Sequence, residues 1–179
     1  MLHIWYLPEH RAWICADENA KLYRIQINKL ENFFVWKEPV ILHSDLVSDC
    51  IEIASPFSMC TFGLDKKIVF YSLSTKQTIR IINDAHLSGI QTGAYMSDFG
   101  GNLITCAFDL TARVWSPGNI YGDCLLGELK GHNHPICDVA VLPKQPFVVT
   151  VDLQNIIIIW DVRNLFRLIK LTSDEKVDE

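Results

Sequence analysis

Short apolar stretches alternate with short polar segments along the whole chain. The apolar stretches are rich in Val, Ile, Phe, Tyr and Trp, which favour strands. Examples are His3–Leu7, Asn102–Ala107 and Phe166–Leu171. We find no stretch with the period of 3.6 residues that marks an amphipathic helix. The pattern therefore predicts an all-β chain of short strands.

Polar residue pairs separate neighbouring apolar stretches and suit tight turns between strands. There are four such pairs: Asn19-Ala20, Asp65-Lys66, Asp109-Leu110 and Gln154-Asn155. Prolines lack a backbone donor, so they are tolerated where a strand ends. On this basis three prolines end the first strand of their segments: Pro8, Pro56 and Pro143.

The same arrangement of residues occurs repeatedly along the chain, and internal repeats are decisive for the fold. In three copies a threonine lies ten positions before a closing aromatic residue: Thr61 and Tyr71, Thr105 and Trp115, Thr150 and Trp160. Two copies also have an aspartate six positions before that aromatic, namely Asp65 and Asp109. A weaker fourth copy spans Ile14–Ile25.

Histidines keep the same phase, because His43, His86 and His132 each precede one of the clearer copies. They are spaced by 43 and 46 residues, which is the range of β-propeller blades. A chain of 179 residues then holds four repeats. We place these at about 1–42, 43–85, 86–131 and 132–171, followed by an acidic tail at 172–179.

These residues resemble the WD-repeat family, most strongly from His86 to Arg163, where Gly131-His132 and Trp160-Asp161 match its two signature dipeptides. The resemblance implies a β-propeller with about four blades, each of four antiparallel strands. It also implies structural hydrogen-bond tetrads. One is His86, Thr105, Asp109 and Trp115, and a second is His43, Thr61, Asp65 and Tyr71.

A third set contains His132, Thr150 and Trp160 but lacks its aspartate, because Gln154 occupies that position. The first repeat departs most, with Cys15, Asn19 and Ile25 at the corresponding positions.

An Asp-His-hydroxyl chain imitates a nucleophilic triad, but a nucleophile must be exposed and this threonine lies within a strand. We therefore expect a structural network and no catalytic residue.

Composition excludes several functions. The chain is 49% hydrophobic and 21% charged, which suits a folded domain, and its net charge of −5 gives no general attraction to nucleic acid or anionic membranes. The longest bulky apolar run, 156–160, is too short to span a membrane. The aromatic side chains near the N-terminus lack the interleaved basic residues of a nucleic-acid surface. With no signal peptide, a cytoplasmic location is expected.

No cofactor or metal is predicted. Nucleotide-binding glycine motifs and the nucleophile-elbow motif are absent from the sequence. Cys124, His132, His134 and Cys137 include zinc-ligand residue types, but their spacing fits no standard pattern and His132 already has a tetrad role. The six cysteines contain no C-x-x-C pair, so we interpret them as free thiols in a reducing compartment.

The resemblance implies a non-enzymatic scaffold that binds other proteins. In this family the residue before the turn aspartate tends to lie on the partner-binding face. In the second, third and fourth repeats this position holds Leu64, Phe108 and Leu153. Packing under neighbouring loops is the other interpretation of these three residues. The motifs Trp115-Ser-Pro and Trp160-Asp-Val-Arg-Asn further resemble WD-repeat proteins of cilia and flagella. The alternatives are a small closed propeller that binds a ligand in its channel, or a propeller enzyme.

The repeats also predict an incomplete, open propeller, since the family's propellers usually close with seven blades. Here His3–Leu7 reads as an innermost strand, and Phe166–Leu171 completes the last blade from its own sequence. The apolar flanks of the first and last blades then need cover. Further blades of the same polypeptide, another chain, or closure into a tight ring would each supply it.

Overall fold

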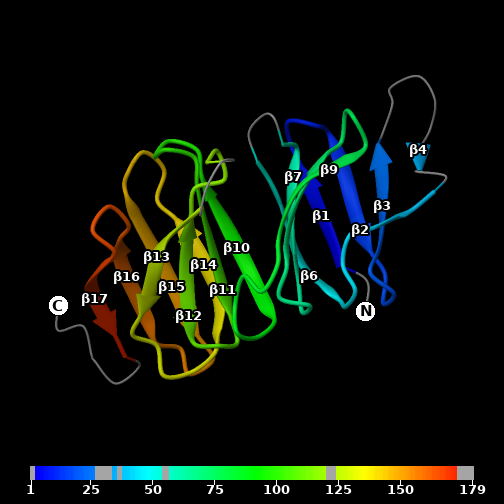
Figure 1. The fold of residues 1–179 in the computed structure, drawn as a ribbon. Helices are drawn as coiled ribbons and strands as arrows, with labels where there is room; N and C mark the ends of the chain where they lie inside the picture. Colours follow the sequence, from blue (N-terminus) through cyan, green and yellow to red (C-terminus); the bar gives the residue numbers. More distant parts are fainter. Residues whose placement is uncertain (1–2, 27–33, 36–37, 54–56, 120–123, 173–179) are drawn as a thin grey trace. The chain divides into compact units, whose positions relative to one another are not determined.

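The computed structural model describes residues 3–26, 34–35, 38–53, 57–119 and 124–172. All regular elements in these ranges are β-strands, which confirms the predicted all-β class (Figure 1). No helix able to cross a membrane occurs in this part of the chain. Pro56 and the predicted acidic tail from residue 173 onward lie outside the described residues.

The strands form four antiparallel sheets, which we number in chain order. Sheet 1 contains β1 (His3–Leu7), β2 (Ala12–Ala16), β3 (Lys21–Gln26), β4 (Phe34–Val35) and β5 (Val40–Ile41). Sheet 2 contains β6 (Val47–Glu52), β7 (Met59–Gly63), β8 (Ile68–Ser72) and β9 (Gln77–Ile82). Sheet 3 contains β10 (Ile90–Met96), β11 (Asn102–Ala107), β12 (Thr111–Trp115) and β13 (Leu125–Lys130). Sheet 4 contains β14 (Ile136–Val141), β15 (Phe147–Asp152), β16 (Ile157–Asp161) and β17 (Phe166–Leu171).

Each sheet is an open meander in which consecutive strands pair, except that β3 of sheet 1 also pairs with β5. The predicted turn pairs lie between the second and third strands of the sheets. The second residue of each pair adopts a positive φ: Ala20, Lys66, Leu110 and Asn155. Bulges also recur at one repeat position, next to Tyr71, Trp115 and Trp160. The repeat thus extends to the backbone geometry of the turns and outer strands.

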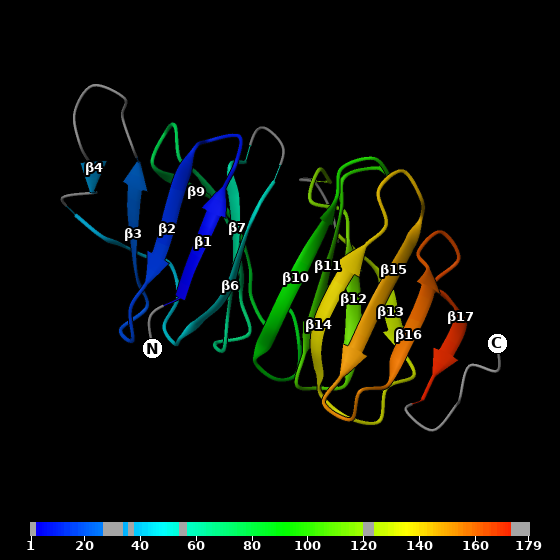
Figure 2. The ribbon, with the colours of Figure 1, turned by 180° about the vertical axis from the view of Figure 1, so that it is seen from behind.

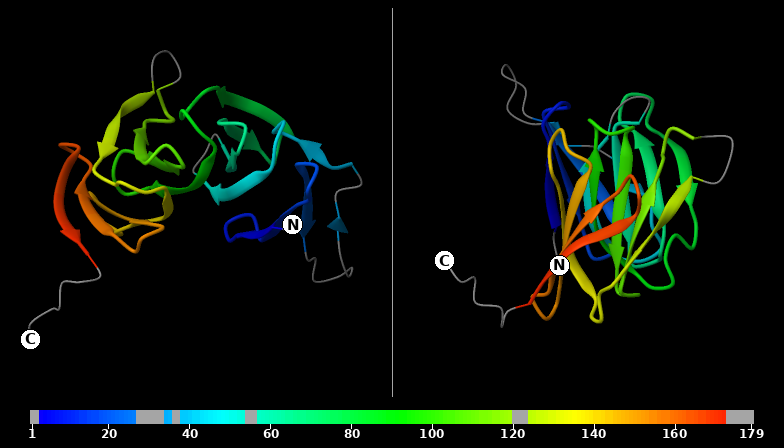
Figure 3. Two further views of the ribbon diagram at one scale, coloured as in Figure 1. Left: turned by 90° about the horizontal axis from the view of Figure 1, so that it is seen from below. Right: turned by 90° about the vertical axis from the view of Figure 1, so that its left-hand side faces the viewer.

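The chain divides into two compact units, 1–90 and 91–179. In the first unit, sheets 1 and 2 lie side by side (Figure 2). Their shared core includes Ile14, Leu22, Met59 and Tyr71. In the second unit, sheets 3 and 4 lie side by side (Figure 3). Their shared core includes Trp160. Sheets with alternating burial stabilise one another in this way, because each buries an apolar face against its neighbour.

Candidate functional site

A buried chain of hydrogen bonds ties two strands of sheet 4 to the loop that precedes the sheet. Trp160 Nε1 on β16 donates to Thr150 Oγ1 on β15 over 2.8 Å. Thr150 Oγ1 lies 2.7 Å from Nε2 of His132, which precedes β14, and His132 Nδ1 lies 2.9 Å from Oδ2 of Asp152. A neutral imidazole with its proton on Nδ1 satisfies every member, since the threonine hydroxyl then donates to Nε2. The network fixes the loop that leads into the sheet.

Sheet 2 holds the corresponding chain. His43 Nδ1 lies 2.8 Å from Asp65 Oδ1, and His43 Nε2 lies 2.9 Å from Thr61 Oγ1. Asp65 Oδ2 also accepts from the backbone amide of Ser44 at 2.8 Å. Tyr71 is buried on β8, at the position that Trp160 occupies in sheet 4. The imidazole of His43 therefore bridges a strand and a turn, whereas His132 contacts two residues of one strand.

In sheet 3, Trp115 Nε1 donates to Thr105 Oγ1 over 2.8 Å. Asp109 Oδ1 accepts from the Thr111 hydroxyl over 2.7 Å, within the turn between β11 and β12. His86 is buried, but it belongs to the first compact unit while Thr105 belongs to the second. The grouping of His86 with this threonine and Asp109 stays a prediction.

The prediction that the last repeat lacks its aspartate is wrong, because Asp152 supplies the carboxylate in place of Gln154. Asp152 lies two residues after Thr150 on the same strand, so both side chains point to the same face and toward His132. The corresponding residue in sheet 2 is Gly63. A Cβ added there would overlap Nδ1 of His43 and lie 2.5 Å from Oδ1 of Asp65. A carboxylate can therefore reach the histidine from either position.

Sheet 1 contains a related aspartate that the sequence interpretation also missed. Asp17 lies two residues after Cys15, as Asp152 lies two residues after Thr150. Its Oδ1 accepts from the amides of Asn19 and Lys21, both at 2.9 Å, and its Oδ2 accepts from the Tyr23 hydroxyl at 3.3 Å. The spacing from the threonine position would have identified both aspartates. Both lie eight positions before the closing residue of their repeat, whereas the sequence pattern placed the aspartate six positions before it.

The environment of these carboxylates stabilises their charged form. Burial alone would raise the pKa of Asp65, but hydrogen bonds from His43 and from the amides of Ser44 and Lys67 outweigh it and lower the pKa. The same balance lowers the pKa of Asp152, through His132 and two turn amides. Both carboxylates therefore remain ionised at neutral pH.

These networks suit a structural role better than catalysis. The hydroxyl groups of Thr61 and Thr150 belong to completely buried residues, and the imidazoles of His43 and His132 have no exposed side-chain surface. A nucleophile needs access to its substrate, and these hydroxyls have none. The Asp-His-Thr chain can therefore hold a loop in place, but it cannot reach a bound molecule.

The three predicted partner-binding residues occupy the same turn position in sheets 2, 3 and 4. Phe108 is 42% exposed and Leu153 is 58% exposed, whereas Leu64 is half-buried. The amide of Leu64 donates to Leu46 O at 2.9 Å, and the amide of Leu153 donates to Pro135 O at 3.0 Å. Leu64 and Leu153 make equivalent backbone hydrogen bonds. We therefore attribute their different exposure to the residues that surround each turn.

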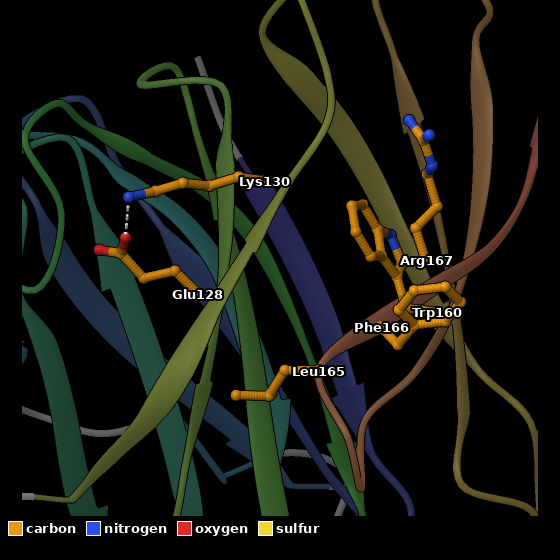
Figure 4. A pocket seen from close by; sticks show the side chains of 6 residues that line it. All are labelled: Glu128, Lys130, Trp160, Leu165, Phe166 and Arg167. Carbon is orange, nitrogen blue, oxygen red and sulfur yellow. Dashed lines mark ion pairs between the residues drawn. The ribbon is translucent and has the colours of Figure 1, made fainter.

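A hollow of about 430 Å³ lies at the outer strands of sheets 3 and 4 (Figure 4). Glu128 and Lys130 line one side of it, and Trp160, Phe166 and Arg167 line the other. The hydrogen bond from Lys130, opposed by desolvation and supported by Arg113, lowers the pKa of Glu128. This carboxylate is therefore already paired and ionised, which makes it a poor general acid at neutral pH.

The described residues contain no group of three or more His, Cys, Asp or Glu side chains that could hold a metal ion. All six cysteines are free thiols, and only Cys137 is partly exposed. Burial raises the pKa of Cys50, Cys60 and Cys106, so these thiols stay protonated. They behave as small apolar residues of the core.

Comparison with known proteins gives two kinds of match, each covering less than half of the chain. Residues 123–161 match the family model described as WD domain, G-beta repeat. The chain is also 31% identical over 70 residues to the nuclear distribution protein nudF of Aspergillus flavus, and equally to that of Aspergillus oryzae. Each alignment covers 36% of this chain and 15% of the relative. The chain therefore spans only a small part of these relatives.

Proposed function

We propose that this chain, which belongs to the WD-repeat family, is a non-enzymatic scaffold that binds other proteins as part of a β-propeller in a larger intracellular assembly. WD-repeat proteins are in general interaction scaffolds. The buried Asp-His-Thr networks support this role, because they hold loops in fixed positions without presenting a reactive group. Rigid loops lose little entropy when a partner binds to them.

The observation that carries the proposal is the exposure of Phe108 and Leu153 at equivalent turns of neighbouring sheets in the second unit. Apolar side chains that gather on one exposed surface are typical of sites where a partner binds. Aromatic and aliphatic anchors of this kind supply much of the binding energy of protein interfaces. Leu64 holds the same position in sheet 2, and we include it at the margin of the partner-binding surface.

The test compares affinity capture by the unmodified chain with capture by the Phe108→Glu, Leu153→Glu double variant. Leu126→Glu is the matched control, because Leu126 is 50% exposed on β13 and lies outside the turn positions. We expect proteins captured by the unmodified and control chains to be lost with the double variant, and the purified partners to reproduce this difference. Unchanged circular dichroism would show that all three chains fold. Full retention of partners by the double variant would refute this surface.

We further propose a cytoplasmic location and, from the resemblance of Trp115-Ser-Pro and Trp160-Asp-Val-Arg-Asn to WD-repeat proteins of cilia and flagella, an assembly within the axoneme. Fluorescence imaging of the tagged protein in ciliated cells tests this placement. Signal along the axoneme is the expected result. A signal confined to the cell body would agree with a cytoplasmic scaffold and contradict the ciliary role.

A further inference from the structure

The hollow at the outer strands of sheets 3 and 4 has a wall of backbone on its β13 side. Leu129 of β13 is buried in the core that the two sheets share. Glu128 and Lys130 lie on either side of Leu129 in the strand, so their side chains point to the opposite face. Figure 4 shows both of them directed away from Trp160 and Arg167. They therefore line the hollow mainly through their main-chain atoms.

Two glycines keep this wall bare. Gly127 and Gly131 alternate with Leu129, so a side chain at either position would point toward sheet 4. A Cβ added at Gly127 would overlap Cδ1 of Leu165, and one added at Gly131 would lie 3.1 Å from Cη2 of Trp160. Glycines allow a backbone to approach a ligand closely. The β13 side of the hollow can therefore accommodate the main chain of a peptide.

The opposite wall of the hollow carries a cation. Arg167 of β17 pairs with Trp160 of β16 and therefore points to the same face of sheet 4, toward β13. A Cβ added at Gly131 would lie 3.7 Å from Arg167 Nη1, which places the guanidinium beside the β13 wall. Within the residues that the structure describes, this guanidinium has no hydrogen bond or ion pair. Lys170 adds a second cation nearby, since its Nζ donates to the carbonyl of Gly131 at 3.3 Å.

The carboxylates on these strands are already paired with other cations. Glu128 Oε1 lies 2.7 Å from Nη2 of Arg113, on the far face of β13. Asp161 accepts from Nε and Nη2 of Arg163 at 3.0 and 2.7 Å. Neither carboxylate bonds to Arg167, so the hollow is locally positive although the whole chain carries a net charge of −5.

Apolar side chains line the rest of the hollow. Phe166 is 63% exposed, Leu165 is half-buried, and Trp160 is almost completely buried. The volume of about 430 Å³ is within the usual range of ligand sites. The hollow thus combines one unpaired cation with an apolar surface, a pattern that suits a carboxylate attached to an apolar group.

We propose that this hollow binds an acidic segment of a partner protein. A carboxylate side chain of the segment pairs with Arg167, and an adjacent apolar side chain packs against Phe166 and Leu165. Complementary charge selects an acidic partner, since the guanidinium has no carboxylate of its own among the described residues. The site rests on the proposed role of the chain as a protein-binding scaffold, and neither Phe108 nor Leu153 lines it.

The test titrates the full, isotope-labelled chain with the peptide acetyl-Ser-Glu-Leu-Glu-Ser-amide and follows the backbone amide resonances by NMR. We expect saturable shifts for Gly127, Gly131 and Arg167. The counterpart peptide, with glutamine in place of both glutamates, should bind at least about tenfold more weakly, because it lacks the charge that Arg167 attracts. Acetate at the same concentrations should cause no saturable shift, because it lacks the apolar group.

Arg167→Gln isolates the contribution of the guanidinium, since Arg167 is exposed and its replacement should leave the fold intact. This variant should bind the acidic peptide about tenfold more weakly and should no longer distinguish it from the neutral peptide. Lys144→Gln is the matched control, because it removes one positive charge from the exposed turn between β14 and β15 and should bind like the unmodified chain. Circular dichroism checks that both variants fold.

Four results would each overturn the site: no binding of the acidic peptide, equal binding of the two peptides, saturable shifts with acetate, or full binding by Arg167→Gln. The double variant Phe108→Glu, Leu153→Glu should bind the acidic peptide like the unmodified chain, because neither residue lines the hollow. If this double variant kept all captured partners while the peptide still bound at Arg167, the turn surface would be refuted and the hollow would stand.

Discussion

The carboxylate of Asp152 accepts hydrogen bonds from His132 Nδ1 at 2.9 Å, from the Gln154 amide at 2.9 Å and from the Ile156 amide at 3.1 Å. Replacing Asp152 by Gly removes all three hydrogen bonds and copies the residue that sheet 2 has at this position. Adding Gln154→Asp to that variant should recreate the arrangement of Gly63 and Asp65 in sheet 2. The pair of substitutions thus moves the carboxylate from the strand to the turn.

The structure sets the size of the effect. His132 is buried, so an unsatisfied Nδ1–H costs about 1–3 kcal/mol, whereas solvent can replace part of the bonding to the part-buried turn amides. Glycine within a strand adds roughly 0.5–1 kcal/mol. We therefore expect Asp152→Gly to lower the free energy of unfolding by about 2–4 kcal/mol. Gln154→Asp alone should change it by less than about 0.5 kcal/mol, because His132 already has an acceptor.

In the Asp152→Gly background, Gln154→Asp should restore about 1–2 kcal/mol, which is a favourable coupling between the two positions. Denaturant unfolding followed by tryptophan fluorescence measures all four chains of this cycle. The matched control is Gln154→Asn, which brings no charge and should restore little. Additive effects, or a loss below about 0.5 kcal/mol for Asp152→Gly, would refute the assignment of Asp152 to the network.

Three further predictions follow from the same contacts. Gly63→Ala should cost about 1–3 kcal/mol in chemical denaturation, since its Cβ would intrude between His43 and Asp65; Gly118→Ala, which meets no atom within 4 Å, should be nearly neutral. The lowered pKa of Asp65 means that its contribution to stability is complete above the unfolded pKa of about 3.9 and is lost as the pH falls toward the folded value. Asp65→Asn should therefore flatten the fall in unfolding free energy between neutral and acidic pH, and an unchanged slope would contradict this. Mass spectrometry after alkylation of the native protein should find Cys137 modified first, because the other five cysteines are buried; earlier labelling of any of them would show that the core opens.

Much of the architecture could be predicted from the sequence because strand and turn signals are local. Short apolar stretches rich in β-branched and aromatic residues located β1, β11 and β17 at their observed bounds. The four predicted turn pairs lie in turns, each with a positive φ at its second residue. The repeated threonine and closing aromatic residue are joined directly where Trp160 donates to Thr150. These features depend on residues close together in the sequence, so the pattern of side chains was enough.

The tertiary structure decided which carboxylate completes the last network and how deeply equivalent apolar positions are buried. Asp152 and Gln154 are two residues apart, and their roles depend on the direction of each side chain relative to His132, which lies 20 residues before Asp152 in the sequence. Likewise, Trp13 and Val148 occupy one repeat position, yet Trp13 is 39% exposed whereas Val148 is buried in the core that sheets 3 and 4 share. Identical local patterns have different burial because burial depends on what packs across the face, and a pattern along one strand carries no information about that neighbour.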